Sequence, residues 1–264
     1  MQAFNKTLLG AGLLAVAATS AQAGLLRFTI EAPGIQVSQV NGYTAPAETF
    51  NEIADAAYPS LNTALGPITP SVGVVDIFNQ NAVGGADEPV GGTYSTYLAG
   101  GNQELTLDLL GSGGPGAVGY FGFWWSAGDG NNELIVNMAD GSSAAFSTQA
   151  IIDSPNLQGS PDGNGVGNVS GHFGNPTAAF LGQVSGEAFA FVNIYARDAN
   201  SKIESLQFRS NAASGFEVDN FTVISDLVPT DDQTGDNVVP IPATALLLLP
   251  GLAGIGLLRR CRGA

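Results

Sequence analysis

Hydrophobic and polar residues alternate with a period of two along several stretches of this chain. The clearest case is residues 104–109, where Leu105, Leu107 and Leu109 fall on one side and polar residues on the other. Successive side chains of a β-strand point to opposite faces, so this pattern is typical of a strand with one buried face. Runs of this kind, separated by glycine-rich turns, predict strands over residues 25–30, 72–78, 93–98, 104–109, 118–125, 133–138, 142–148, 187–195, 203–208 and 215–223.

The segments between these runs are rich in turn-forming residues. Asp140-Gly141 predicts a hairpin turn. Residues 45–65 are interrupted by prolines and leave strand and helical turn both open, whereas residues 156–176 predict a surface loop. No segment between the two ends of the chain has a helical period. The pattern therefore predicts an all-β fold over residues 24–225, an antiparallel β-sandwich of jelly-roll type.

Trp124 and Trp125 are adjacent in the most aromatic stretch of the chain, residues 118–125. Neighbouring residues of a strand point to opposite faces, so at most one of the two indoles can face the core. The other indole is either covered by a loop or available to stack on a sugar ring. Both tryptophans are therefore candidate sugar-stacking residues, with packing in the core as the alternative.

An apolar run without alternation lies near the start of the chain. Lys6 is the only charge before residues 8–18, and Ala21 and Ala23 form the small-x-small pattern of a cleavage site. The run is too short for a membrane-spanning helix. Residues 1–23 therefore predict a signal peptide that is cleaved after Ala23.

A second apolar run lies near the other end, where residues 241–258 are 18 uncharged residues. As a helix they would be about 27 Å long, close to the roughly 30 Å hydrocarbon core of a bilayer. Arg259, Arg260 and Arg262 follow and form the positive flank expected on the cytoplasmic side. A single transmembrane helix with a basic stop is predicted, separated from the domain by the acidic, polar linker 226–238. Its glycine and proline content favours a transient anchor.

The sorting motif Val239, Pro240, Ile241 and Pro242 stands directly before this span. Motif, span and arginine cluster together, over residues 239–264, resemble the PEP-CTERM sorting signal of Gram-negative bacteria in a Val-Pro-Ile-Pro variant. The resemblance implies that an exosortase, a membrane-embedded cysteine protease, recognises the tail and removes it during export to the surface. Isoleucine stands where the family name has glutamate, which points to a variant subclass. An ordinary single-span anchor is the alternative.

A second resemblance lies within the domain. The aromatic run 120–126, the strand residues 191–194 and the strand 215–220 occur in the order found in the β-sandwich domain of many exosortase-dependent surface proteins. The similarity covers about residues 50–224. It implies an exported protein of the cell surface or of the extracellular matrix.

The charge of the exported part is strongly negative. All 23 acidic residues lie between Glu31 and Asp236, whereas four of the eight basic residues lie in the two terminal segments. The remaining four basic residues against 23 acidic ones leave a formal net charge of −19. Such a surface repels nucleic acid and anionic lipids, so nucleic acid is excluded as a partner.

Few residue types suited to catalysis are present in the predicted domain. The only cysteine, Cys261, lies in the tail, so the domain has neither a disulfide nor a thiol nucleophile. His172 is the only histidine, no Gly-x-Ser-x-Gly motif accompanies it, and we expect it to be a solvated loop residue. A glycosidase needs only two carboxylates, but no rule of sequence selects a pair among so many acids.

Calcium is the metal that the composition favours, because it takes oxygen ligands from carboxylates, amides and carbonyls. Asp129 and Asn131 alternate in one turn, and Asp219 lies in a strand that resembles the last strand of carbohydrate-binding jelly rolls. These three residues are the candidate ligands of a structural Ca²⁺. The alternative is that Asp219 and Asn220 bind neighbouring backbone groups. No cofactor is required.

These observations predict a non-enzymatic protein of the cell surface or the extracellular matrix, with a structural or adhesive role in exopolysaccharide or biofilm. Its expected partners are the exosortase, the inner membrane during sorting, and exopolysaccharide. The first alternative is a carbohydrate-binding module, with or without a stabilising Ca²⁺. The second alternative, ranked below it, is a glycan hydrolase.

Overall fold

A computed structural model describes residues 26–40, 45–79, 82–86, 96–99, 104–148, 169–211 and 215–227. The predicted signal peptide, linker, sorting motif and basic tail lie outside these ranges. The described part is built from antiparallel β-strands and two short 3₁₀ helices. The elements are β1 (Leu26–Ile30), β2 (Ala56–Tyr58), β3 (Leu61–Thr63), β4 (Gly66–Pro70), β5 (Val75–Asn79), β6 (Thr96–Ala99), β7 (Glu104–Asp108), β8 (Tyr120–Gly128), β9 (Asn132–Met138), β10 (Ser143–Ser147), η3 (Val169–His172), η4 (Ala178–Phe180), β11 (Ala188–Ala196), β12 (Ile203–Ser210) and β13 (Glu217–Ile224).

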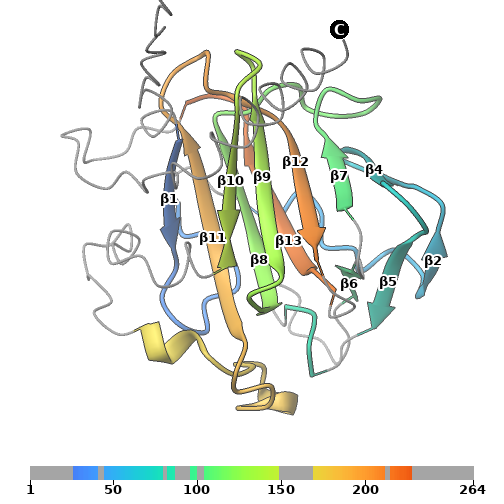
Figure 1. Cartoon of the computed structure of the whole chain (residues 1–264), viewed down its shortest axis with the longest axis vertical. Coiled ribbons are helices and arrows are strands. Elements are labelled where there is room, and N and C mark those ends of the chain that lie inside the picture. The colour runs from blue at the N-terminus through green and yellow to red at the C-terminus, as the bar shows by residue number, and fades with distance from the viewer. Residues whose placement is uncertain are drawn as a thin grey trace, which may run out of the picture.

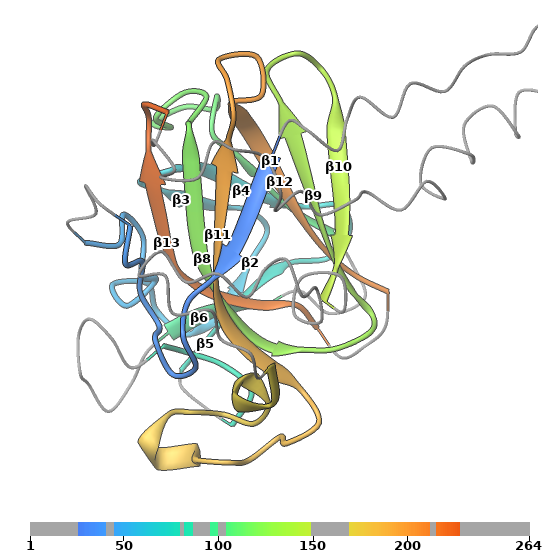
Figure 2. The same ribbon diagram turned by 90° about the vertical axis from the view of Figure 1, so that its left-hand side faces the viewer.

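The strands form two sheets that face one another (Figures 1 and 2). One sheet has seven strands in the order β1-β11-β8-β13-β6-β5-β2, and the other has six in the order β10-β9-β12-β7-β4-β3. All pairings among these strands are antiparallel. The predicted all-β, antiparallel sandwich is therefore confirmed.

The two sheets differ in how much of each strand is buried. In β9 of the six-stranded sheet, buried and half-buried residues alternate, so one face meets the core and the other meets solvent. In β8 and β11 of the seven-stranded sheet, every residue is buried. Their nearly continuous apolar sequences fit strands that are covered on both faces. The outer face of the seven-stranded sheet is thus occupied by other parts of the chain.

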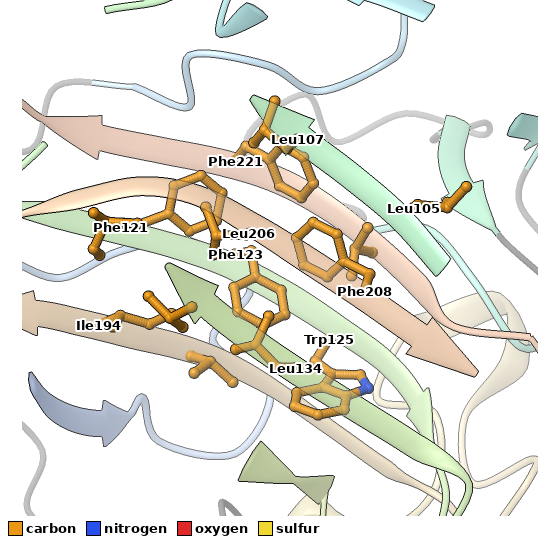
Figure 3. Close-up of a cluster of buried hydrophobic side chains, with 14 of the residues drawn as sticks. Leu105, Leu107, Phe121, Phe123, Trp125, Leu134, Ile194, Leu206, Phe208 and Phe221 are labelled. Atoms are coloured by element: carbon orange, nitrogen blue, oxygen red, sulfur yellow. The ribbon is translucent and has the colours of Figure 1, made fainter. Parts of the chain in front are cut away.

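The core between the sheets is rich in aromatic rings (Figure 3). Phe123 of β8 meets Phe208 of β12 edge-on, with ring centroids 5.5 Å apart. Phe121 and Phe208 both pack against Phe221 of β13, at 5.3 and 5.6 Å. Fully burying such a side chain is worth about 1.5–3 kcal/mol. This cluster therefore makes a large contribution to holding the two sheets together without a disulfide.

Several strands lie where the alternation predicts them. Leu105, Leu107 and Leu109 are all fully buried in the main core, as their shared face requires. The short strands β2, β3 and β4 within residues 45–70 were not predicted. Proline is normally excluded from the interior of a strand. Because β4 contains Pro67 as its second residue and Pro70 as its last, its sequence does not indicate a strand.

Two further predictions fall partly or wholly outside the described ranges. Only the last part of the expected loop 156–176 is described, and it includes the 3₁₀ helix η3 rather than irregular chain alone. No helix within the described ranges is long and apolar enough to cross a membrane. The membrane span expected at residues 241–258 lies outside the described ranges.

Candidate functional site

The outer face of the seven-stranded sheet carries a second, smaller apolar cluster. Trp124 lies in it with Phe189 and Phe191 of β11, and the segment around Val83 and Ala86 packs against the same cluster. Trp125 points the opposite way, into the main core. The exposed fractions of the two residues are 1% and 0%. The opposite orientation is as predicted, but neither indole presents a face to a sugar, which corrects the candidate stacking role of Trp124 and Trp125.

A buried hydrogen-bond network fixes residues 31–40 over the same sheet face. The Tyr120 hydroxyl donates to Asn193 Oδ1 at 2.6 Å and lies 2.8 Å from Ser38 Oγ. Asn193 in turn donates through Nδ2 to Thr29 Oγ1 at 3.2 Å and to Glu31 Oε1 at 2.9 Å. The partners come from β8, β11, β1 and the segment after β1. Because buried polar groups are costly when unpaired, this network specifies one position for the covering segment.

A second set of contacts connects residues 31–40 to β13 and to Thr177, in the segment before β11. Asn220 has a φ of +52° and donates from Nδ2 to the Gln36 carbonyl at 2.9 Å. The Gln36 side chain donates from Nε2 to Thr177 Oγ1 at 3.3 Å, and both residues are buried. The ladder between β13 and β8 shifts between Asp219 and Thr222, which is a bulge that aims Asn220 at residues 31–40.

His172 also packs against residues 31–40, the segment that covers the seven-stranded sheet. Its exposed fraction is 2%, and its Nε2 lies 3.0 Å from the Glu31 carbonyl oxygen. The expectation of a solvated loop histidine is therefore wrong. The composition of the surrounding loop suggested solvent exposure, whereas η3 folds back onto the segment after β1 and buries the ring.

The candidate calcium ligands lie in two separate settings. Asp129 Oδ1 accepts from the Asn131 backbone N–H at 2.7 Å within the turn between β8 and β9. Asp219 is fully buried within β13, where its carboxylate accepts from the backbone N–H groups of Ala86 and Asn220. Burial raises the pKa of Asp219 well above its usual range. The backbone-binding alternative for Asp219 and Asn220 is thus what the structure contains.

No metal-holding group of three or more His, Cys, Asp and Glu side chains occurs within the described ranges. The three candidate ligands therefore do not form a ready site there. Asp219 is already bound to backbone donors, and Asp129 and Asn131 bond to each other.

Three carboxylates gather at one end of the seven-stranded sheet, and we call Asp129, Glu187 and Glu217 the acidic end. Glu217 is 6% exposed, whereas Asp129 and Glu187 are half-buried. Burial, and secondly the charges of Glu187 and Asp129, raise the pKa of Glu217 to about 8. Burial and the charge of Asp129 also raise the pKa of Glu187. With a pKa of about 8, the Glu217 carboxyl is mostly neutral at pH 7.

Exposed apolar side chains lie on the segment that leads into β11. Phe173 is 40% exposed and Leu181 is 73% exposed. Phe173 forms an isolated antiparallel bridge with Ala188, next to Glu187. The exposed aromatic ring is therefore anchored at the same end of the sheet as the acidic end. Figure 2 shows this segment, with η3 and η4, projecting beyond the strands.

Comparison of the sequence with protein-family models and with curated proteins gives no match. Among solved structures, one described as an exo-beta-agarase aligns with 72% of this chain at 10% sequence identity. The chain spans only 26% of that protein, and the TM-score is 0.30. A similarity of that size carries no argument about function.

Sequence reasoning missed three of these features: the segments that cover the seven-stranded sheet, the hydrogen bonds of Asn193, and the acidic end. Glu217 and Asp219 alternate with Phe216 and Val218, so the period of two alone indicates a solvent-facing side for them. Both are nevertheless buried, and Asp219 is covered by the distant segment of Ala86, from whose backbone N–H it accepts a hydrogen bond. The one available signal was Asn193, a polar residue between the apolar Val192 and Ile194 of a buried strand.

Proposed function

We propose that this protein is a non-enzymatic structural element of the cell surface or extracellular matrix, built on a jelly-roll-like sandwich. The observation that best supports the proposal is the hydrogen-bonded layer over the seven-stranded sheet. Tyr120 and Asn193 join strand to covering segment there through buried hydrogen bonds. Loops that are joined to a sheet in this way favour a rigid, protease-resistant module over a mobile catalytic lid.

We further propose that export and sorting follow from the two ends of the chain. The signal peptide 1–23 directs the protein across the inner membrane, and the span 241–258 holds it there transiently. An exosortase then cleaves at the Val-Pro-Ile-Pro motif, and the domain associates with exopolysaccharide. The formal charge of −19 keeps such a domain soluble and away from anionic lipids.

Localisation of variants tests the sorting proposal. Deletion of residues 239–264 should release the domain into the periplasm or the medium. Replacement of Pro240 and Pro242 by alanine should retain the uncleaved chain in the membrane fraction. Thr234→Ala, in the predicted linker, is the matched control and should leave sorting unchanged. Unaltered surface localisation of the deletion variant would contradict the proposal.

Carbohydrate binding is the second candidate function, with Phe173 in place of the tryptophans. Its ring is 40% exposed, and its backbone pairs with Ala188 at the same end of the sheet as the acidic end. An exposed aromatic ring is a surface on which a sugar ring can pack. Phe173→Ala should weaken binding to the producing strain's own exopolysaccharide about tenfold, equivalent to about 1.4 kcal/mol. Leu181→Ala, on the same segment, should not. Equal binding by both variants would remove Phe173 from the proposal.

Calcium binding at Asp129 and Asn131 stays a prediction. Isothermal titration of the purified domain with Ca²⁺, together with a melting curve, tests it. Heat of binding and a raised melting temperature that Asp129→Asn abolishes would support the site. An absence of both in the wild-type domain would eliminate it.

A further inference from the structure

Two segments far apart in the sequence, residues 31–36 and residues 171–177, lie against each other over the seven-stranded sheet, and we call their contact the seam. The contact between the His172 ring and the backbone after β1, at 3.0 Å, joins residues that are 141 positions apart. Gly171 packs so closely on Pro33 that a Cβ added to the glycine would lie 2.8 Å from the proline ring. The seam is therefore a tight contact between the segment after β1 and the segment before β11.

The seam brings an amide and a hydroxyl together. Gln36 Nε2 donates to Thr177 Oγ1 at 3.3 Å, and the exposed fractions of the two residues are 3% and 2%. The carboxamide carbon of Gln36, Cδ, is bonded to Nε2, so the hydroxyl oxygen lies next to the one acyl carbon of that side chain. A hydroxyl nucleophile and an acyl carbon are thus enclosed together, away from bulk water.

The backbones of both residues are held in place by other side chains. The Gln36 carbonyl accepts from Asn220 Nδ2 at 2.9 Å, and the Thr177 backbone N–H donates to Asn175 Oδ1 at 2.8 Å. Asn175 is fixed in turn, because its Nδ2 donates to the Ala82 carbonyl at 2.9 Å. Groups that are held in contact in this way react as if they were present at a very high concentration, because the entropy of bringing them together is already lost.

Two side chains of the seam can ionise, those of Glu31 and His172. Glu31 Oε1 accepts from the Gln39 backbone N–H at 3.0 Å and from Asn193 Nδ2 at 2.9 Å. The carboxylate therefore has partners of its own, and the imidazole of His172 is the group of the seam suited to carry a proton near neutral pH. Because its Nε2 faces a carbonyl oxygen, which can only accept, Nδ1 is the nitrogen that can act as a base.

We propose that Thr177 and Gln36 form an intramolecular ester in the folded protein. The Thr177 hydroxyl oxygen bonds to Gln36 Cδ, the Cδ–Nε2 bond breaks, and the hydroxyl proton, carried by His172, leaves with the amide nitrogen as ammonia. Nothing is oxidised or reduced, so the step needs no co-reactant. Ammonia escapes into solution, whereas the burial of both residues keeps out the water that would hydrolyse the ester.

The ester goes beyond the proposed structural role and gives the domain a covalent link that it otherwise lacks. Residues 24–225 contain no cysteine, so no disulfide can form there. A link between residues 141 positions apart constrains the unfolded chain and so stabilises the fold. It also keeps the segment after β1 attached to the segment before β11 when individual hydrogen bonds open.

Peptide mapping of the purified full-length chain tests the ester. A protease that cleaves after Glu and Asp releases Gln36 in the peptide 32–48 and Thr177 in the peptide 163–187. In the wild type these two peptides should be found joined, at the sum of their masses less one ammonia, about 17 Da. Mild base should separate them and leave a carboxylic acid on residue 36, because it hydrolyses an ester much faster than an amide.

Four variants extend the test. Thr177→Val lacks the hydroxyl and should give two separate peptides, whereas Thr177→Ser keeps a hydroxyl and should still give the joined pair. Thr69→Val removes an exposed hydroxyl group elsewhere and should behave like the wild type. His172→Gln cannot carry the proton and should lower the joined fraction; an unchanged fraction would overturn that route for the proton.

The peptide map of the wild type is decisive even if a variant does not fold. Two separate peptides of unaltered mass would overturn the proposal. So would a loss of ammonia confined to one peptide, as from a succinimide at an asparagine, or a joined pair that persists in Thr177→Val. Sorting depends on the tail and not on the seam, so either proposal can fail without the other.

Discussion

Trp125 and Phe216 stack in the main core with their ring planes inclined by only 18°. Phe216 also meets Phe208 of the opposite sheet edge-on, at 5.4 Å. The pair therefore links β8 and β13 within one sheet and connects both to the other sheet. Offset or edge-on aromatic pairs add about 0.5–1.5 kcal/mol to the free energy gained by burying their surface. This contact is thus a sensitive place to measure how far the sandwich depends on its aromatic core.

Phe216→Ala should destabilise the domain by about 3–5 kcal/mol, because it removes a buried ring and leaves a cavity between the sheets. The free energy of unfolding in urea measures the loss. Leu181→Ala, which shortens a side chain that is 73% exposed, is the control and should change that free energy by at most about 0.5 kcal/mol. A loss below about 1 kcal/mol for Phe216→Ala would show that the stack is not important for stability.

Removal of one hydroxyl tests the layer over the seven-stranded sheet. Tyr120→Phe deletes the donor to Asn193 and leaves that buried acceptor with one partner fewer, which should cost about 1–3 kcal/mol. Tyr58→Phe is the matched control, since its hydroxyl donates to the Ala54 carbonyl at an exposed position. Proteolysis of residues 31–40 should accelerate in the first variant only. Equal rates in both variants would mean that the network does not hold the segment in place.

Much of the sandwich could be predicted from the sequence, and the outer layer could not. The period of two in residues 104–109 depends on one local fact, that one face of a strand meets the core, and local patterns report such facts well. Asp219 and His172 are buried against segments far from them in the sequence: Asp219 accepts from the Ala86 backbone N–H, and His172 lies against the Glu31 carbonyl. The periodicity of a strand carries no information about which distant loop covers its outer face. A polar residue in an alternating strand therefore looks solvent-facing whether or not something lies above it.

The stability of the domain should fall as pH rises from about 5 to 8. The pKa of Glu217 is about 8 in the folded chain against an ordinary value of 4.5, so the folded state holds a proton that the unfolded state releases in this interval. Stability then decreases with pH by at most about 1.4 kcal/mol per unit from this group. The raised pKa of Asp219 acts in the same direction.

Urea unfolding at several pH values measures that dependence. The slope should be smaller in Glu217→Gln than in the wild type, and the variant should be the more stable of the two at pH 8. Glu52→Gln, which also removes one carboxyl group but at an exposed site, should keep the wild-type slope. Equal slopes in the wild type and in Glu217→Gln would contradict a raised pKa of Glu217 in the folded domain.

Gly215 lies two residues before Glu217, and its substitution tests how closely the Glu217 side chain packs against the backbone there. It has a φ of +86°, and a Cβ at this position would lie only 2.4 Å from Glu217 Oε1. Gly215→Ala should therefore cost more than the roughly 1 kcal/mol of a left-handed residue alone, because the carboxyl must also move. Gly130→Ala, where a Cβ meets nothing within 4 Å, is the control. Combining Gly215→Ala with Glu217→Ala should recover part of the loss in urea unfolding, since the shortened side chain removes the clash. If the double variant lost as much free energy of unfolding as the two single variants added together, the two residues would not interact.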